Sequence, residues 1–146
     1  YDFYEPRCIH ESSLSPSIHS ILACRLGWMQ KAEDYFGFAT RMDLDDYNRN
    51  TCEGLHTTSI AGAWMNIVYG FGGLNCDGDL LNLSPCIPAQ WKQYSFTIQT
   101  GGSVLRITVS QEKVTLERLS GATVTLRLYG RKVTVADAPL VHVREA

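Results

Sequence analysis

Ile67-Val68-Tyr69-Gly70-Phe71-Gly72-Gly73-Leu74-Asn75 is the stretch at which the pattern of the sequence changes. Before it, apolar residues recur at spacings of three and four, which is typical of helices that bury one face. After it, apolar and polar residues alternate, which is typical of half-buried strands. Helices followed by strands indicate two structural units rather than alternating strands and helices. We therefore predict a helical unit over residues 1–74 and a strand unit over residues 75–146.

Two helices are predicted in the first third of the chain. The first has Ser15 as its N-cap, Pro16 at the first helical position and Gly27 just past its end. The second repeats the same apolar spacing over residues 29–42. Because only a short break separates them, we expect an antiparallel helical hairpin.

A third predicted helix starts near Thr57–Ser59 and ends at Gly72, and its small residues 61–63 would let a neighbouring helix approach closely. Residues 43–51 are rich in Asp and Asn, which favour turns, so we expect a loop there. Three helices with apolar faces are too few to close a large core. We therefore expect them to be the end of a larger helical assembly, and the chain to be a piece of a longer polypeptide.

The alternation beyond residue 75 predicts six or seven short strands, with turns at Gly101-Gly102, Ser120-Gly121 and Gly130. Evenly spaced strands with polar outward positions indicate an antiparallel sandwich, jelly-roll-like in character. The apolar positions of this alternation are Tyr94, Phe96, Ile98, Leu105, Ile107, Val109, Val114, Leu116, Val124, Leu126, Leu128, Val133, Val135, Val141 and Val143.

Composition and charge argue against several classes of function. A formal net charge of -2 disfavours a nucleic-acid surface. No apolar run approaches the roughly 20 residues that cross a bilayer. The five cysteines include no Cys-x-x-Cys pair, so neither a zinc site nor a disulfide framework is predicted. We expect a cytoplasmic protein with reduced thiols, no nucleic-acid or membrane partner, and no metal.

Two motifs place a histidine and hydroxyl side chains at the start of a predicted helix. His10-Glu11-Ser12-Ser13-Leu14-Ser15 precedes the first helix, and His56-Thr57-Thr58-Ser59 opens the third. A helix N-terminus presents unpaired N–H groups and the positive end of its dipole, so two such ends brought together would bind an anion. The alternative is that the hydroxyls only cap their helices and that both histidines are structural. The residues alone leave both alternatives open.

Carboxylates and aromatic side chains near these motifs suggest glycoside chemistry. Cleaving a glycosidic bond needs a general acid, and an inverting hydrolase also needs a base. Glu11 and Glu53 lie beside the motifs; charge complementarity at a helix end is the preferred explanation for Glu53 and an equal alternative for Glu11. The segment Asp43-Leu44-Asp45-Asp46 lacks the spacing of a calcium loop and is predicted to be a solvated turn. Aromatic residues that would stack on a sugar ring, or else fill a core, are Tyr1, Phe3, Tyr4 and Trp64.

Four segments, in this order, resemble the C-terminal part of the disaccharide phosphorylases of glycoside hydrolase family 65, the maltose, kojibiose and trehalose phosphorylases. They are Tyr1-Asp2-Phe3-Tyr4-Glu5-Pro6-Arg7, His10–Ser15, Asp43–Asn48 and Gly54–Trp64. The resemblance covers essentially the whole chain, being strong through residue 74 and looser in the strands. It implies the last helices of an α/α toroidal barrel, which carries the catalytic domain, over residues 1–74 and a C-terminal β-sandwich over residues 75–146.

The resemblance also implies an activity. Family members cleave an α-linked glucosyl disaccharide with inorganic phosphate, invert the anomeric carbon and release β-glucose 1-phosphate, with phosphate as co-substrate and no cofactor. It implies that phosphate is bound by Ser12, Ser13, His56 and Thr58. The family's general acid belongs to an earlier segment that this sequence lacks. We therefore assign no catalytic residue and expect the chain alone to be inactive.

Two alternatives stay open. One is an inverting, trehalase-like hydrolase on the same scaffold, in which Glu11 would act as the base that activates water. The other is that the isolated chain is a non-catalytic module for folding or oligomerisation. The expected partners are the disaccharide, phosphate, the missing N-terminal part of the same protein and, for a homo-oligomer, a second copy.

Overall fold

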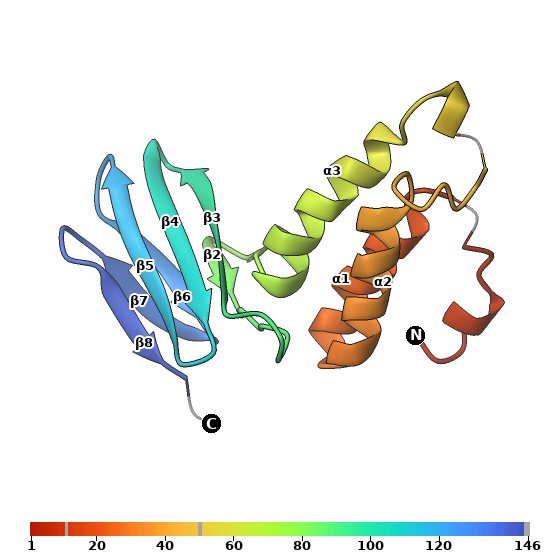
Figure 1. The fold of residues 1–146 in the computed structure, drawn as a ribbon. Coiled ribbons are helices and arrows are strands. Elements are labelled where there is room, and N and C mark those ends of the chain that lie inside the picture. Colours follow the sequence, from red (N-terminus) through yellow and green to blue (C-terminus); the bar gives the residue numbers. More distant parts are fainter. Residues whose placement is uncertain (11, 50, 145–146) are drawn as a thin grey trace. The chain divides into compact units, whose positions relative to one another are not determined.

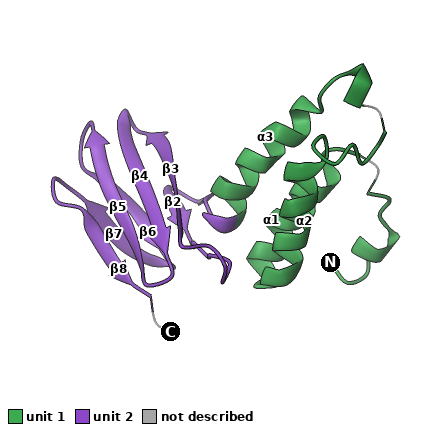
Figure 2. Cartoon of the chain, in the orientation of Figure 1, with its two compact units in different colours: residues 1–70 green, residues 71–146 purple. Residues whose placement is uncertain are grey.

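A computed structural model describes residues 1–10, 12–49 and 51–144 (Figure 1). The chain divides into two compact units, Tyr1–Gly70 and Phe71–Ala146 (Figure 2). The first is helical and the second consists of strands, which confirms the predicted fold class. No helix in the described part of the chain is long and apolar enough to cross a membrane.

In the helical unit, α1 (Ser15–Leu26) and α2 (Met29–Arg41) form the predicted hairpin (Figure 1). Gly27 adopts the left-handed conformation with φ 74°. Its N–H donates to the carbonyl of Cys24, and the N–H of Trp28 donates to that of Ala23 at 2.9 Å. These two bonds form a Schellman motif, which needs the positive φ that glycine adopts without strain.

The third helix, α3 (Thr57–Met65), continues into a π-helical turn, η3 (Asn66–Phe71). Gly62 of α3 lies against Ser17 of α1, where an added Cβ would come within 2.2 Å of the Ser17 Oγ. The hydroxyl of Ser59 donates to the carbonyl of Ala39 on α2 at 2.7 Å. The predicted close approach of a helix to the small residues 61–63 is thus confirmed at Gly62.

Short segments complete this unit. They include the 3-10 turns η1 (Glu5–Arg7) and η2 (Thr51–Glu53), and residues 43–48 form the turns that the sequence predicted. Asp46 has a φ of 46°, and its Oδ1 accepts hydrogen bonds from both the backbone N–H and the hydroxyl of Thr51. Large apolar side chains that stay exposed on the helices and their connections are Leu14, Ile18, Leu22, Leu26, Trp28, Ile60 and Trp64.

The strand unit contains two four-stranded sheets, with strand orders β1-β2-β6-β7 and β3-β4-β5-β8 (Figure 1). The first sheet consists of β1 (Asn75–Asp77), β2 (Leu80–Leu83), β6 (Val124–Leu128) and β7 (Arg131–Val135). The second consists of β3 (Gln93–Thr100), β4 (Ser103–Ser110), β5 (Lys113–Ser120) and β8 (Leu140–Val143). Buried side chains of the core are Leu83, Phe96, Leu105, Ile107, Val109, Val114, Leu116, Leu126, Leu128 and Val135.

The first sheet differs from the prediction in two details. Its strands β1 and β2 were not predicted, because they are too short to show alternation. The pair β2–β6 is parallel, with Leu83 opposite Leu128, whereas the other strand pairs of the described residues are antiparallel as expected. A parallel partner that lies far along the chain leaves no local signature in the sequence.

The polarity of β8 is the reverse of the prediction. Val141 and Val143 were expected to alternate inward, but they are 53% and 71% exposed. Since successive side chains of a strand point to opposite faces, His142 lies on the face away from the two valines. This arrangement is tolerated because β8 pairs only with β5, at the edge of its sheet.

Candidate functional site

The two hydroxyl motifs meet in the structure. The Oγ of Ser13, just before α1, lies 2.9 Å from the Oγ1 of Thr58, in the first turn of α3. The two hydroxyls are exposed and come from positions 45 residues apart in the sequence. Only one proton is used between them, so the pair keeps a second hydroxyl proton for a ligand. This is the juxtaposition that an anion site at two helix starts requires.

Helix capping does not explain these hydroxyls. The N-caps of α1 and α3 are Leu14 and His56, and neither helix has a side-chain capping bond. The prediction of Ser15 as N-cap is wrong by one residue, because its hydroxyl bonds with Nδ1 of His10 at 2.8 Å instead. Ser12 accepts a long bond of 3.4 Å from the N–H of Leu14, and its own proton is not used there. Ser13 and Thr58 are therefore not the N-caps that the alternative required.

Asp43 holds the imidazole of His56 in place. The Nδ1–H of His56 donates to Oδ1 of Asp43 at 2.5 Å, and its backbone N–H donates to Oδ2 at 2.8 Å. Both side chains are largely buried, at 20% and 16% exposure. These hydrogen bonds from His56 lower the pKa of Asp43 below its usual value and keep it ionised. With Nδ1 engaged, Nε2 is the nitrogen that remains for a ligand.

The other histidine, His10, is a structural residue. Its Nδ1 bonds with Ser15, and its Nε2 lies 3.0 Å from the phenolic oxygen of Tyr35. Burial lowers the pKa of His10, and the nearby His19 acts in the same direction, so the ring is neutral at pH 7. Both nitrogens are satisfied within the protein, which confirms the structural alternative for His10 alone.

A hydrogen-bonded chain leads from His10 to a carboxylate. The hydroxyl of Tyr35 donates to Glu5, and Nζ of Lys31 donates to the other oxygen of Glu5 at 2.9 Å. The bonds from Tyr35 and Lys31 lower the pKa of Glu5, while burial and then Glu5 raise that of Tyr35. Since the proton of Tyr35 goes to Glu5, the Tyr35 oxygen accepts from Nε2–H of His10, and Nδ1 of His10 accepts from Ser15. This network fixes the segment that leads into α1.

The remaining candidates are spread over the unit. Glu11 lies outside the described residues. Glu53 is exposed in η2. Tyr1 packs edge-on against Trp28 at 5.1 Å, Phe3 against Tyr4 at 5.0 Å, and Trp64 against Tyr69 at 6.2 Å. These aromatic contacts do not form one stacking surface for a sugar.

Two carboxylates that form key hydrogen bonds in this region were not predicted from the sequence. Asp43 was interpreted as part of a solvated turn, although it is the partner of His56. The signal that would have found it is a carboxylate just after one helix and a histidine just before the next, because a compact loop brings such ends together. Glu5 gave no signal, since its partners Lys31 and Tyr35 lie one turn apart on α2 and at a distance in the sequence.

Comparison with protein-family models assigns both units to one family. Residues 1–65 match the glycosyl hydrolase family 65 central catalytic domain, and residues 74–135 match the C-terminal domain of the same family. The chain belongs to glycoside hydrolase family 65. It therefore belongs to a family of enzymes, as the resemblance indicated.

Relatives within family 65 are phosphorylases by name. The chain is 40% identical over 92% of its length to a maltose phosphorylase of Bacillus subtilis, and 41% identical over 96% to an alpha,alpha-trehalose phosphorylase of Geobacillus stearothermophilus. A solved structure, described as a candidate kojibiose phosphorylase from the human microbiome, superposes with a TM-score of 0.93 at 50% identity over the whole chain. This family 65 chain spans about 18% of the two curated relatives and 21% of the solved one.

Proposed function

We propose that this chain forms the phosphate-binding side of the active site of an inverting disaccharide phosphorylase. In this proposal, residues 1–74 are the last helices of an α/α barrel. The substrate is an α-linked glucosyl disaccharide, which inorganic phosphate cleaves to β-glucose 1-phosphate and a free sugar. The observation that carries the proposal is the contact between Ser13 and Thr58, because it joins the starts of α1 and α3 without serving as a cap for either helix.

The groups at this place suit a phosphate dianion. The hydroxyl protons of Ser12 and of the Ser13–Thr58 pair are donors that the contacts described above leave for a ligand, and Nε2 of His56 takes no part in the bond to Asp43. In this proposal His56 binds phosphate as an imidazolium, with Nδ1–H held by Asp43 and Nε2–H donating a charge-assisted hydrogen bond to a phosphate oxygen. The starts of α1 and α3 add the positive ends of two helix dipoles.

In the reaction, these groups would position the nucleophile. A phosphate oxygen attacks the anomeric carbon from the face opposite the glycosidic oxygen, the new C–O bond forms as the old one breaks, and the configuration inverts. The departing oxygen takes its proton from a general acid outside this chain. Ser12, Ser13, His56 and Thr58 hold the phosphate in line and balance its charge, which is catalysis by positioning and electrostatics.

Steady-state kinetics of the full-length enzyme tests the assignment. Ser13→Ala and His56→Ala should each raise the KM for phosphate by roughly 10- to 100-fold, since each removes a hydrogen bond to a charged group. Thr97→Ala, which removes a hydroxyl from β3 in the sandwich, serves as the control and should leave the KM unchanged. An unaltered phosphate dependence in both site variants would refute the proposal.

Product analysis separates the phosphorylase from the hydrolase. A phosphorylase forms glucose 1-phosphate only when phosphate is supplied, whereas a hydrolase releases free glucose in phosphate-free buffer. Substituting Glu11 with Gln should leave phosphorolysis intact if that residue is not a base. Turnover in phosphate-free buffer that disappears in the Glu11 variant would favour the hydrolase instead.

Further parts of the proposal concern the whole protein. The isolated 146-residue chain should show no turnover, because the general acid lies elsewhere. The absence of a Cys-x-x-Cys pair or a disulfide pattern among the five cysteines of the sequence supports the proposal of a cytoplasmic location. Turnover by the isolated chain would show that it contains its own acid.

A further inference from the structure

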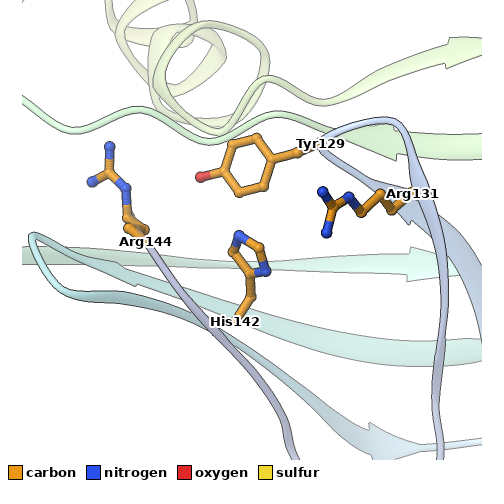
Figure 3. Close-up of a pocket in the computed structure, with 4 residues that line it drawn as sticks. All are labelled: Tyr129, Arg131, His142 and Arg144. Atoms are coloured by element: carbon orange, nitrogen blue, oxygen red, sulfur yellow. The ribbon is translucent and has the colours of Figure 1, made fainter. Parts of the chain in front are cut away.

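A pocket of about 340 Å³ opens in the sandwich, away from the hydroxyl motifs in sequence, and is lined by Tyr129, Arg131, His142 and Arg144. Figure 3 shows the rings of Tyr129 and His142 between the two arginines, with the phenolic oxygen on the Arg144 side. Tyr129 and Arg131 belong to the turn after β6 and to β7, whereas His142 lies in β8 and Arg144 follows it. Both sheets therefore contribute to the pocket. Its volume lies at the lower end of the range for small-molecule sites.

The reversed polarity of β8 gives this pocket its chemistry. If hydrophobic burial alone set the orientation of β8, the side chains of Val141 and Val143 would point inward, but both are exposed. In this C-terminal segment, the residues that line the pocket are the polar ones, His142 in β8 and Arg144 just after it. The arrangement forgoes the burial of two valines and places an imidazole and a guanidinium at the pocket instead, which hydrophobic packing alone does not explain.

The positive charge of the pocket is not balanced within the described part of the chain. Neither Arg131 nor Arg144 forms an ion pair with a described carboxylate. Arg144 donates from Nη1 to the carbonyl of Ser110 at 3.2 Å and also hydrogen-bonds the phenolic oxygen of Tyr129. These bonds orient its guanidinium and leave its remaining N–H groups for a ligand. Two guanidinium groups beside an imidazole are the donor set that binds phosphate groups through paired hydrogen bonds.

Tyr129 is held in a backbone conformation that other residue types adopt more easily than tyrosine does. Tyr129 and Gly130 connect β6 to β7 with φ angles of 50° and 76°, which is a type I′ turn. Asn or Gly suits the first position of such a turn, and a tyrosine there is strained. The strain is offset by a bond from its hydroxyl to the carbonyl of Pro85 at 2.7 Å and by contact with the ring of His142, at 5.1 Å. The result is a fixed aromatic wall between the two arginines.

We propose that this pocket binds the phosphate group of a small phosphate monoester, such as a sugar phosphate. Arg131 and Arg144 supply the positive charge that a dianion needs, and His142 adds a ring nitrogen for hydrogen bonding. The Tyr129 ring offers an apolar face for the organic part of the ligand. The proposal does not depend on the phosphorylase assignment, because none of its residues belongs to the hydroxyl motifs.

Isothermal titration of the full-length protein with glucose 6-phosphate tests the pocket. Glucose 6-phosphate should bind saturably, whereas glucose, which has the same ring and no phosphate, should not bind there. The double variant Arg131→Gln, Arg144→Gln should raise the dissociation constant at least tenfold. Lys132→Gln is the matched control for the single variant Arg131→Gln, since each removes one positive charge from β7. The side chain of Lys132 points to the opposite face, so its loss should change the constant less than twofold.

The other outcomes decide against the proposal. Equal weakening by Lys132→Gln would show a general charge effect, and equal binding of glucose would show that phosphate is not recognised. Ser13→Ala with His56→Ala should leave this binding unchanged, and loss of binding in that variant alone would assign the ligand to the hydroxyl motifs. If the double variant unfolds, Arg131→Gln by itself keeps the test valid, because the side chain of Arg131 forms no hydrogen bond with the described residues. The affinity of this single variant should still fall at least threefold.

Discussion

The two units hold their elements together in different ways. Between the helices, specific contacts of small or polar groups do this work: Gly62 lies against Ser17, and the hydroxyls of Ser20 and Ser59 donate to carbonyls of α2. Between the strands, apolar side chains such as Leu105 and Ile107 are fully buried. The sandwich therefore depends mainly on buried apolar area, whereas the helical unit adds a few close fits of small and polar groups to its own buried apolar side chains. Mutations should distinguish these two kinds of stability.

The largest effect is expected in the sandwich core. Ile107→Ala removes a fully buried side chain of β4 and should lower the free energy of unfolding by about 2–5 kcal/mol. Val141→Ala, at an exposed position of β8, is the control and should change it by less than about 0.5 kcal/mol. Urea denaturation followed by circular dichroism measures both. Similar losses for the two variants would show that burial does not govern this unit.

A glycine contact tests the helical unit. Gly62→Ala should lower the free energy of unfolding by about 1–3 kcal/mol, because the new methyl group would lie 2.2 Å from the Ser17 Oγ and push α1 and α3 apart. Gly37→Ala in α2 has open space around the new methyl group and should stabilise the protein by about 0.5–1 kcal/mol. Thermal unfolding of the two variants compares them directly. A stable Gly62→Ala protein would mean that the helices are not closely fitted.

A buried amide offers a sharper test of the same unit. Asn66, in η3, is fully buried, and neither polar atom of its side chain has a hydrogen-bond partner among the described residues. Asn66→Leu should therefore raise the free energy of unfolding by about 1 kcal/mol, since it removes an unsatisfied polar group of similar size. A fall in stability would show that the amide is satisfied in solution, by water or by another part of a longer protein.

The smallest effect concerns the pH dependence of the Asp43–His56 pair. The pKa of Asp43 is lowered in the folded state, so its ionised form contributes stability above its ordinary pKa near 4. That contribution is lost as the pH falls through the lowered value. Asp43→Asn should thus reduce the melting temperature at pH 6, and the difference from wild type should shrink toward pH 3. Asp34→Asn, whose carboxylate accepts an exposed hydrogen bond from Gln30 among the described residues, should show no such convergence.

Periodicity predicted most of the fold because it is a local property. The hairpin of α1 and α2, the turn at Gly27 and the alternation of β3 to β6 all follow from spacing within single elements. The parallel pair β2–β6 and the reversed face of β8 did not, since both depend on neighbours distant in the sequence. Local patterns give the elements, and long-range pairing decides which face of an edge strand is buried.

The candidate site was also predictable from the sequence only where its features are local. Ser13, His56 and Thr58 were recognisable because helix starts have a local chemistry of hydroxyls and free N–H groups. Their contact, and the Asp43 carboxylate that orients His56, belong to the tertiary structure. The prediction of Ser15 as the N-cap was wrong for a different, local reason: its hydroxyl bonds with His10, 5 residues earlier in the chain, instead of capping α1.

The parallel pair also sets an order of events during synthesis. Strand β2 leaves the ribosome soon after the helices, but its partner β6 is made only after three further strands. Until then, β2 pairs only with β1 and presents one edge of unpaired backbone groups, which other chains can bind. A chain that stops before Leu128 would keep that edge open, so translation pauses between residues 83 and 128 expose the nascent protein to aggregation.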